Sequence, residues 1–146
     1  MIKIILTFLL FSLSYNLFAK DCSMEIQSSD MMRYDKKTIN VNNSCKSFKI
    51  LLKHSGKLPK NVMGHNIVII KTDDLNKVTS KISMAHGLKK GYLPEIEEVI
   101  FKSEVIGGGE ETILEINPSK LKNGIDYTFF CSFPGHFAIM KGKIII

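Results

Sequence analysis

Near its C-terminus the chain reads Cys131-Ser132-Phe133-Pro134-Gly135-His136-Phe137-Ala138-Ile139-Met140. Residues 127–130 (Tyr-Thr-Phe-Phe) precede this segment and residues 141–146 (Lys-Gly-Lys-Ile-Ile-Ile) follow it, and both are rich in residues that favour strands. Pro134-Gly135 interrupts the pattern, as turn residues do. We therefore expect a loop between two strands that carries a thiol, an imidazole and a thioether.

A thiolate, imidazoles and a weakly bound thioether together form the ligand set of a redox copper ion. The second imidazole is expected from His65, which directly precedes the apolar run at residues 66–70. Strand ends are where a β-sandwich presents functional side chains, so distant ligands can meet there. The sequence predicts one copper ion bound by His65, Cys131 and His136, with Met140 as a weak axial ligand.

The rest of the chain has the pattern of an all-β protein. Short apolar or alternating segments recur between turn residues at eight places: 23–27, 38–41, 45–52, 66–70, 96–105, 112–116, 127–131 and 140–146. This pattern predicts an eight-stranded sandwich of two sheets with Greek-key connections. One external α-helix is expected near residues 72–87, where Leu75, Val78, Ile82 and Ala85 recur at helical spacing.

The N-terminus has the features of an export signal. Residues 1–19 contain one early lysine, an apolar stretch and a final alanine suited to cleavage. An uncleaved membrane anchor is the alternative, although Ser14, Tyr15 and Asn16 interrupt the apolar run and leave it short for a span. We expect residues 20–146 to form a single exported domain without stable membrane association.

Three cysteines bear on the redox compartment. In an oxidising space two of Cys22, Cys45 and Cys131 should pair. Since Cys131 stands among metal-ligand types, Cys22–Cys45 is the expected disulfide. The alternative is a bridge to Cys131, which would remove the thiolate from the ligand set.

The net charge is mildly basic. The formal charge of +6 arises from scattered lysines and a single arginine, Arg33, and no basic run is interleaved with aromatic residues. This pattern does not favour nucleic-acid binding. A basic surface can still bias the chain toward acidic protein partners.

Several segments resemble the cupredoxin family of blue copper proteins. The similarity covers essentially all of residues 20–146, and its Cys-x4-His-x3-Met spacing is that of one branch, whereas plastocyanin-like members have a shorter Cys–His gap. The matching segments are residues 61–66, residues 131–136 followed by Met140-Lys141-Gly142, Cys22-Ser23, Cys45-Lys46, Leu58-Pro59-Lys60 and residues 119–122.

This resemblance implies further roles. The backbone carbonyl of Gly64 would be a second weak axial contact, Asn66 would tie the two ligand loops together, and Phe133 would pack beside the site. His136 would reach the surface through an apolar docking patch. The patch residues that match the family are Met32, Leu58, Val62, Met63, Pro134, Ala138 and Ile139, with Phe133 at its edge.

Three positions either differ from the family pattern or allow more than one interpretation. Ile67 stands where the family often has a buried tryptophan, and Phe137 occupies a position beside His136 that is commonly small. We expect Phe137 either to enlarge the patch or to narrow partner access. His54 matches a histidine linked to proton-coupled redox changes in the family; a satisfied, partly buried histidine is the equal alternative.

The resemblance implies a periplasmic electron carrier, not an enzyme. Its expected partners are redox proteins, namely c-type cytochromes, reductases or peroxidases. The rival hypotheses are a copper enzyme, which would need ligands beyond His54 and His86, and a cysteine hydrolase using Cys131 and His136. A copper store, a copper chaperone or a zinc site would use the same ligands as the carrier.

Overall fold

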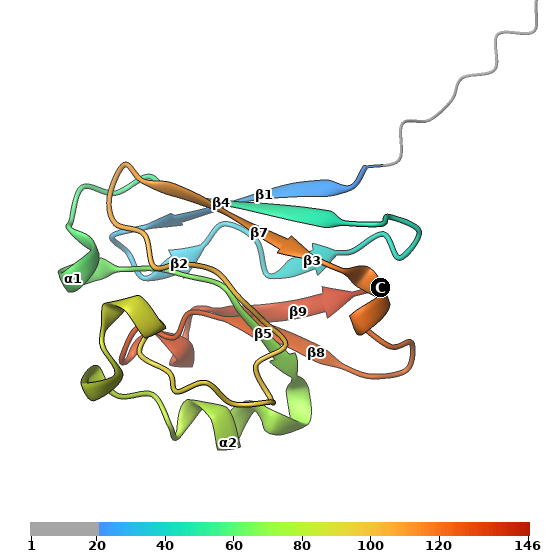
Figure 1. Ribbon diagram of the computed structural model, residues 1–146. Coiled ribbons are helices and arrows are strands. Elements are labelled where there is room, and N and C mark those ends of the chain that lie inside the picture. The colour runs from blue at the N-terminus through green and yellow to red at the C-terminus, as the bar shows by residue number, and fades with distance from the viewer. Residues whose placement is uncertain (1–20) are drawn as a thin grey trace, which may run out of the picture.

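The computed structural model describes residues 21–146. Two β-sheets pack face to face over these residues, and one short helix, α2, lies outside them (Figure 1). The expected export signal, residues 1–19, lies outside the described range. Within that range, none of the helices has the length and apolar character needed to span a bilayer.

The first sheet contains four strands in the order β2-β1-β4-β7. Their bounds are Arg33–Tyr34 for β2, Ser23–Ser29 for β1, Phe48–His54 for β4 and Glu111–Ile116 for β7. β4 shows why these residues form strands, because Phe48, Ile50 and Leu52 point into the core while Lys49 faces solvent. This alternation is the two-residue period of a half-buried strand.

The second sheet has the order β3-β9-β8-β5-β6. Its strands are Thr38–Asn40 (β3), Lys141–Ile145 (β9), Tyr127–Phe130 (β8), Val68–Lys71 (β5) and Phe101–Lys102 (β6). The expected two-sheet sandwich is confirmed. The described residues form nine strands where eight were expected, because β2 adds a two-residue pairing to the end of β1. The strand expected over residues 96–105 is reduced to β6.

β5 is buried on both faces, which explains its continuous apolar sequence. Ile67 and Ile69 point into the main core between the sheets. Val68 and Ile70 join a second apolar cluster with Val78 of α2. Ile67 is fully buried in the main core, so the fold accommodates it where the family often has tryptophan.

The external helix is confirmed, but it is shorter than the expected 72–87. A single 3-10 turn, Thr72–Asp74, leads into α2, Leu75–Thr79. The hydroxyl of Thr79 donates to the carbonyl of Leu75, and the hydroxyl of Ser80 donates to that of Lys77. Such side-chain bonds compete with the helical ladder. The chain then continues through 3-10 turns at Met84–His86 and Leu88–Lys90.

The expected disulfide is also confirmed. Cys22 and Cys45 are bonded, with their Cα atoms 5.8 Å apart. Cys22 directly precedes β1, and Cys45 precedes β4, which pairs with β1 in parallel. Among the described residues Cys131 is left as the free cysteine, and it is buried.

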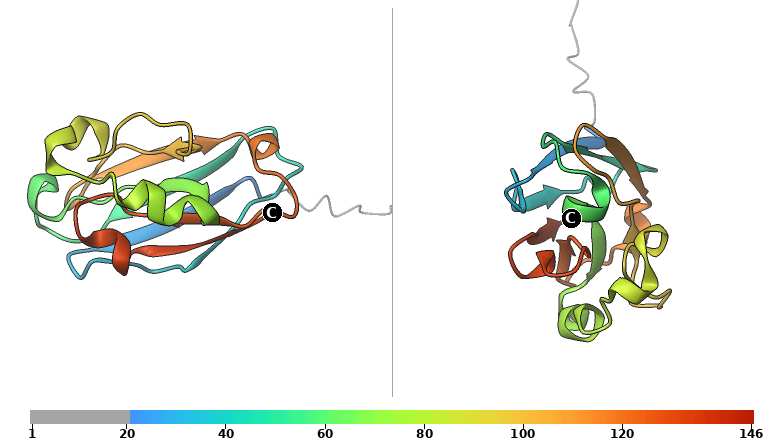
Figure 2. Two further views of the ribbon diagram at one scale, coloured as in Figure 1. Left: turned by 90° about the horizontal axis from the view of Figure 1, so that it is seen from below. Right: turned by 90° about the vertical axis from the view of Figure 1, so that its left-hand side faces the viewer.

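One end of the sandwich gathers the segments that were expected to carry the site. Helix α1, Lys60–Met63, lies there together with the 3-10 turn His136–Ala138. Figure 2 shows both at the end of the molecule opposite the C-terminus. The remaining 3-10 turn, Pro118–Lys120, follows β7.

Candidate metal centre

The sheet register brings the two ligand-bearing segments together. β5 and β8 are antiparallel neighbours, with Val68 opposite Phe130. The residues just before β5 and just after β8 must therefore lie side by side. His65 stands before β5, fixed by two 2.9 Å backbone hydrogen bonds with Ile106, and Cys131 follows β8 directly.

Three of the predicted ligands converge. The ligand atoms of His65, Cys131 and His136 all lie within 4.8 Å of one another, and all three residues are buried. The Cys131 Sγ atom is 3.9 Å from Nδ1 of His65 and 3.7 Å from Nδ1 of His136. This trigonal set of two imidazole nitrogens and one sulfur fits a type 1 copper ion.

The backbone fixes which nitrogen of His65 faces the site. Its Nε2 lies 2.9 Å from the carbonyl oxygen of Ser29. A carbonyl only accepts, so Nε2 carries the proton and Nδ1 presents a lone pair to the ligand cluster. A histidine oriented in this way by its second nitrogen is typical of metal sites.

Burial controls the protonation of these ligands in the metal-free protein. It lowers the pKa of His65 to about 4 and also lowers the pKa of His136. Burial raises the pKa of the Cys131 thiol to about 11, although the backbone N–H groups of Asn66 and Phe133 act in the opposite direction. The imidazoles are thus ready to bind at neutral pH, whereas the thiol must release its proton to a metal.

The two predicted axial groups lie at the same end. The Gly64 carbonyl oxygen is 3.8 Å from the Cys131 sulfur. A β-carbon on Gly64 would come within 2.3 Å of the Lys60 carbonyl, so the close approach of the backbone requires glycine. Met140 is fully buried, and its backbone bonds to Cys131 and His136 close the loop.

The Asn66 side chain joins the two ligand loops, and the role predicted for it beside a copper ion stays a prediction. Its Oδ1 accepts from the backbone N–H of Ser132 at 2.9 Å, and its Nδ2 donates to the Ser132 hydroxyl at 2.9 Å. The Ser132 hydroxyl also contacts the Gly91 carbonyl at 2.6 Å. Ser132 and the Ser29 carbonyl were not predicted from the sequence; only the position of Ser132 beside Cys131 offered a signal.

The Phe133 ring packs beside the ligand cluster. Its ring stacks on His136 with 4.4 Å between centroids, and it meets Tyr92 edge-on at 5.1 Å. Because Phe133 belongs to the core, it supports the His136 ring from within the protein.

The predicted patch residues are mostly exposed around this end. Val62 is 54% exposed and Ile139 52%, and Met32, Leu58 and Ala138 are also exposed. Met63 and Pro134 are half-buried. Phe137 is half-buried too and packs against the second apolar cluster beneath α2, so it does not extend the patch freely.

His54 lies behind the site with both ring nitrogens bonded. Its Nδ1 accepts from the Gly56 N–H and its Nε2 donates to the Met63 carbonyl, both at 2.9 Å. Its ring stacks on His65 at 4.5 Å. Both ring nitrogens of this buried histidine thus have hydrogen-bond partners; a role in proton-coupled redox change stays a prediction.

Comparison with known proteins agrees with this geometry. Residues 20–146 match the family model for copper-binding proteins of the plastocyanin/azurin family. The chain is 47% identical to azurin of Bordetella pertussis over 137 residues, which cover 93% of the chain and 91% of the relative. It is 46% identical to azurin of Pseudomonas aeruginosa over 139 residues, covering 94% and 93%.

A solved structure is also similar to this chain. The azurin Az-iso2 of Methylomonas sp. strain J matches with a TM-score of 0.80 and 36% identity, covering 86% of this chain and 98% of that one. Fold, ligand cluster and similarity lead to one conclusion. The chain belongs to the plastocyanin/azurin family of copper-binding proteins, whose members carry electrons and are not enzymes.

Proposed function

We propose that this chain is a periplasmic blue copper protein that carries single electrons between c-type cytochromes and reductases or peroxidases. The observation that supports this function is the convergence of His65, Cys131 and His136 in a buried cluster. When bound, a copper ion supplies a one-electron Cu(II)/Cu(I) couple at this cluster. Met140 and the Gly64 carbonyl are the proposed weak axial contacts.

The surroundings of the ligand cluster favour fast electron transfer. The Ser29 carbonyl orients His65, and the Asn66 side chain holds the Cys131 loop. Ligands held in place by the folded chain cannot relax freely when the oxidation state changes, so little reorganisation accompanies transfer. Burial of all three ligands excludes water from the site.

His136 provides the proposed route to the surface. His136 is 3% exposed, and exposed members of the predicted docking patch lie on its own loop and on α1. An exposed apolar surface of this kind suits brief docking, because association needs no charged group to be desolvated. The patch residues therefore have a proposed function separate from folding.

Export to the periplasm is supported by two features. Residues 1–19 have the pattern of a cleavable signal. The Cys22–Cys45 disulfide also favours an oxidising compartment. Both are consistent with a carrier that meets its partners outside the cytoplasm.

The enzyme hypotheses receive no support from the site. Within residues 21–146, His65, Cys131 and His136 form the one cluster with metal-ligand geometry, whereas a copper enzyme would need further centres. Burial also raises the pKa of Cys131, the opposite of what an activated nucleophile requires.

Stopped-flow electron exchange with a reduced c-type cytochrome tests the carrier function. We expect rapid reoxidation of the cytochrome by the copper-loaded protein. Ile139→Lys should slow this exchange roughly tenfold, since a loss of about 1.4 kcal/mol in docking free energy has that effect. Ile113→Lys is the matched control, because Ile113 is 56% exposed on β7 outside the patch.

Two outcomes would contradict the proposal. Absence of exchange with cytochromes, reductases and peroxidases alike would remove the carrier function. Equal rates for the Ile139→Lys and Ile113→Lys proteins would remove the docking role of the patch.

A further inference from the structure

A turn and a loop that are distant in sequence lie side by side at the end of the sandwich that carries the ligand cluster. The Asp30 carboxylate accepts hydrogen bonds from the backbone N–H groups of Lys57 and Leu58, at 2.8 and 3.3 Å. Met32, in the same turn as Asp30, and Leu58 are both exposed members of the predicted docking patch. Lys57 is exposed as well, so a cation flanks this part of the patch.

A second cation is held against the Cys131 loop. The Nζ atom of Lys37 donates to the carbonyl of Ile139 at 3.0 Å and lies 3.5 Å from the carbonyl of Lys141. Ile139 is an exposed patch residue on this loop. Because two carbonyls hold the ammonium group, the Lys37 side chain has less freedom to lose when a partner docks.

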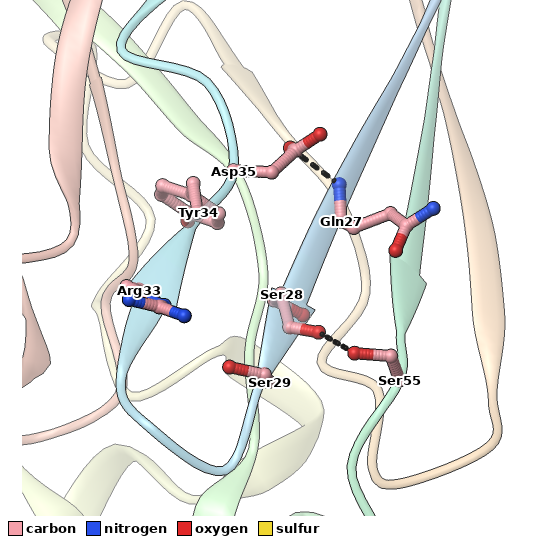
Figure 3. A pocket seen from close by; sticks show the side chains of 7 residues that line it. All are labelled: Gln27, Ser28, Ser29, Arg33, Tyr34, Asp35 and Ser55. Carbon is pink, nitrogen blue, oxygen red and sulfur yellow. Dashed lines mark hydrogen bonds between the residues drawn. The ribbon is translucent and has the colours of Figure 1, made fainter.

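Arg33 supplies a third cation, directly after Met32. It lines a polar pocket together with Asp35, and Figure 3 shows the Asp35 carboxylate turned toward the backbone N–H of Gln27. That N–H donates to Asp35 at 2.8 Å, and the Lys36 ammonium group lies 2.6 Å from the second oxygen of the same carboxylate. The Asp35 charge is thus offset by Lys36, and Arg33 remains exposed.

The three cations are exposed and lie at the edge of the patch, and we call them the cationic rim: Arg33, Lys37 and Lys57. Within the described part of the chain none of them forms an ion pair. Glu110 is paired with Lys60 at 3.0 Å, and Glu104 shares a hollow with Lys89. The Asp30 carboxylate can offset one charge of the rim, which leaves the surroundings of the patch positive.

We propose that the patch docks an acidic redox protein, whose carboxylates face the cationic rim while its apolar surface covers the patch. This inference rests on the proposed carrier function. Attraction between opposite charges raises the rate of encounter, and cations at the rim act mainly on this rate. They stay hydrated in the complex, whereas a lysine inside the apolar contact, as in Ile139→Lys, would lose its water on docking.

A partner that docked through apolar contact alone would have a different kinetic signature. Its exchange rate would change little with salt, because no long-range attraction would be screened. With an acidic partner the rate falls as salt is added, since the Debye length shortens from about 30 Å at about 0.01 M to about 3 Å at about 1 M. The salt dependence of the rate therefore separates the two kinds of partner.

The test measures stopped-flow electron exchange of the copper-loaded protein with two c-type cytochromes of similar potential, one of net negative and one of net positive charge. With the acidic cytochrome we expect the second-order rate constant to fall roughly tenfold between about 0.01 M and about 1 M salt. The triple variant Arg33→Gln, Lys37→Gln, Lys57→Gln should be roughly fivefold slower than wild type at the lower salt and equal to it at the higher. With the basic cytochrome both trends should reverse.

A second triple variant removes the same net charge from the opposite end of the sandwich: Lys46→Gln, Lys71→Gln, Lys122→Gln. All three lysines are exposed. Lys46 and Lys122 precede β4 and β8, which run toward the ligand cluster, and Lys71 ends β5, which runs away from it. This variant should react with the acidic cytochrome at close to the wild-type rate. Both copper-loaded variants should keep the wild-type absorption spectrum, which shows that fold and site are intact.

Equal slowing of the two triple variants would overturn the inference and leave the carrier function standing. A rate with the acidic cytochrome that did not fall with salt would do the same. Absence of exchange with both cytochromes at every salt concentration would overturn the proposal of cytochrome partners, and this inference with it.

Discussion

Asn66 shows how much one side chain contributes to this site. It satisfies the backbone N–H of Ser132 and the Ser132 hydroxyl, both in the protein interior. Asn66→Ala should lower the free energy of unfolding by about 3 kcal/mol, because a buried donor is left without a partner. Urea denaturation of the metal-free protein measures this loss.

Asn43→Ala is the control for that change, because Asn43 is exposed in the turn before Cys45. Its cost should stay within about 0.5 kcal/mol, as expected for surface substitutions. Comparable losses in the two variants would show that Asn66 is no more than a replaceable polar residue.

The buried imidazoles predict how the stability of the metal-free protein depends on pH. The pKa of His65 falls from its ordinary value of 6.5 to about 4 on folding, and that of His136 falls as well. Between these values the unfolded chain binds more protons than the folded chain. Stability should therefore be fully present above about pH 6.5 and decline as the pH falls toward 4.

Denaturant titrations of the metal-free protein across this range measure the effect. His65→Gln should flatten the decline, whereas His86→Gln, in a 3-10 turn outside the site, should leave it intact. A wild-type stability that stayed constant from pH 7 to pH 4 would contradict the assignment of buried, neutral imidazoles.

At the scale of elements, the disulfide holds together two strands that are distant in sequence. Cys22 and Cys45 are 23 residues apart and flank the parallel pair β1 and β4. Replacing both by alanine should lower the unfolding free energy by about 3 kcal/mol, since the unfolded chain gains the entropy of an open loop. Thermal and urea unfolding measure this cost.

The ligand cluster lies on other elements, so the Cys22→Ala, Cys45→Ala protein should still bind copper with an unchanged absorption spectrum. Loss of the spectrum at temperatures where the chain remains folded would show that the disulfide also shapes the site.

The sequence predicted those elements whose signals are local. Cys131, His136 and Met140 share one loop, so their spacing could be read directly from the sequence. The extent of α2 could not be predicted, because the Thr79 and Ser80 hydroxyls compete with the helical ladder where apolar spacing favours helix. The burial of β5 on both of its faces could be predicted from its unbroken apolar run.

At the scale of the whole molecule, the site depends on contacts that only the fold creates. The Ser29 carbonyl reaches His65 from β1, and the Tyr34 hydroxyl reaches Asn66 from β2. Neither residue type is unusual, so no motif marked them. Patch residues were predicted through family resemblance; Val62 on α1 and Ile139 on the Cys131 loop are exposed, and their docking role stays a prediction.

The sandwich thus separates two tasks. Its interior holds the ligand atoms of His65, Cys131 and His136 within 4.8 Å of one another, and apolar side chains such as Val62 and Ile139 are exposed at the same end. A rigid frame of this kind explains how one small domain can hold the Cys131 sulfur buried beside two imidazoles.

The most direct test of the account is the absorption spectrum after one equivalent of Cu(II) is added to the metal-free protein. We predict an intense blue complex that is absent from Cys131→Ser, because the colour requires the thiolate of that residue. Zn(II) bound to the same ligands should give a colourless protein, because its d shell is full. A colourless copper complex, or an identical spectrum in Cys131→Ser, would contradict a type 1 copper centre.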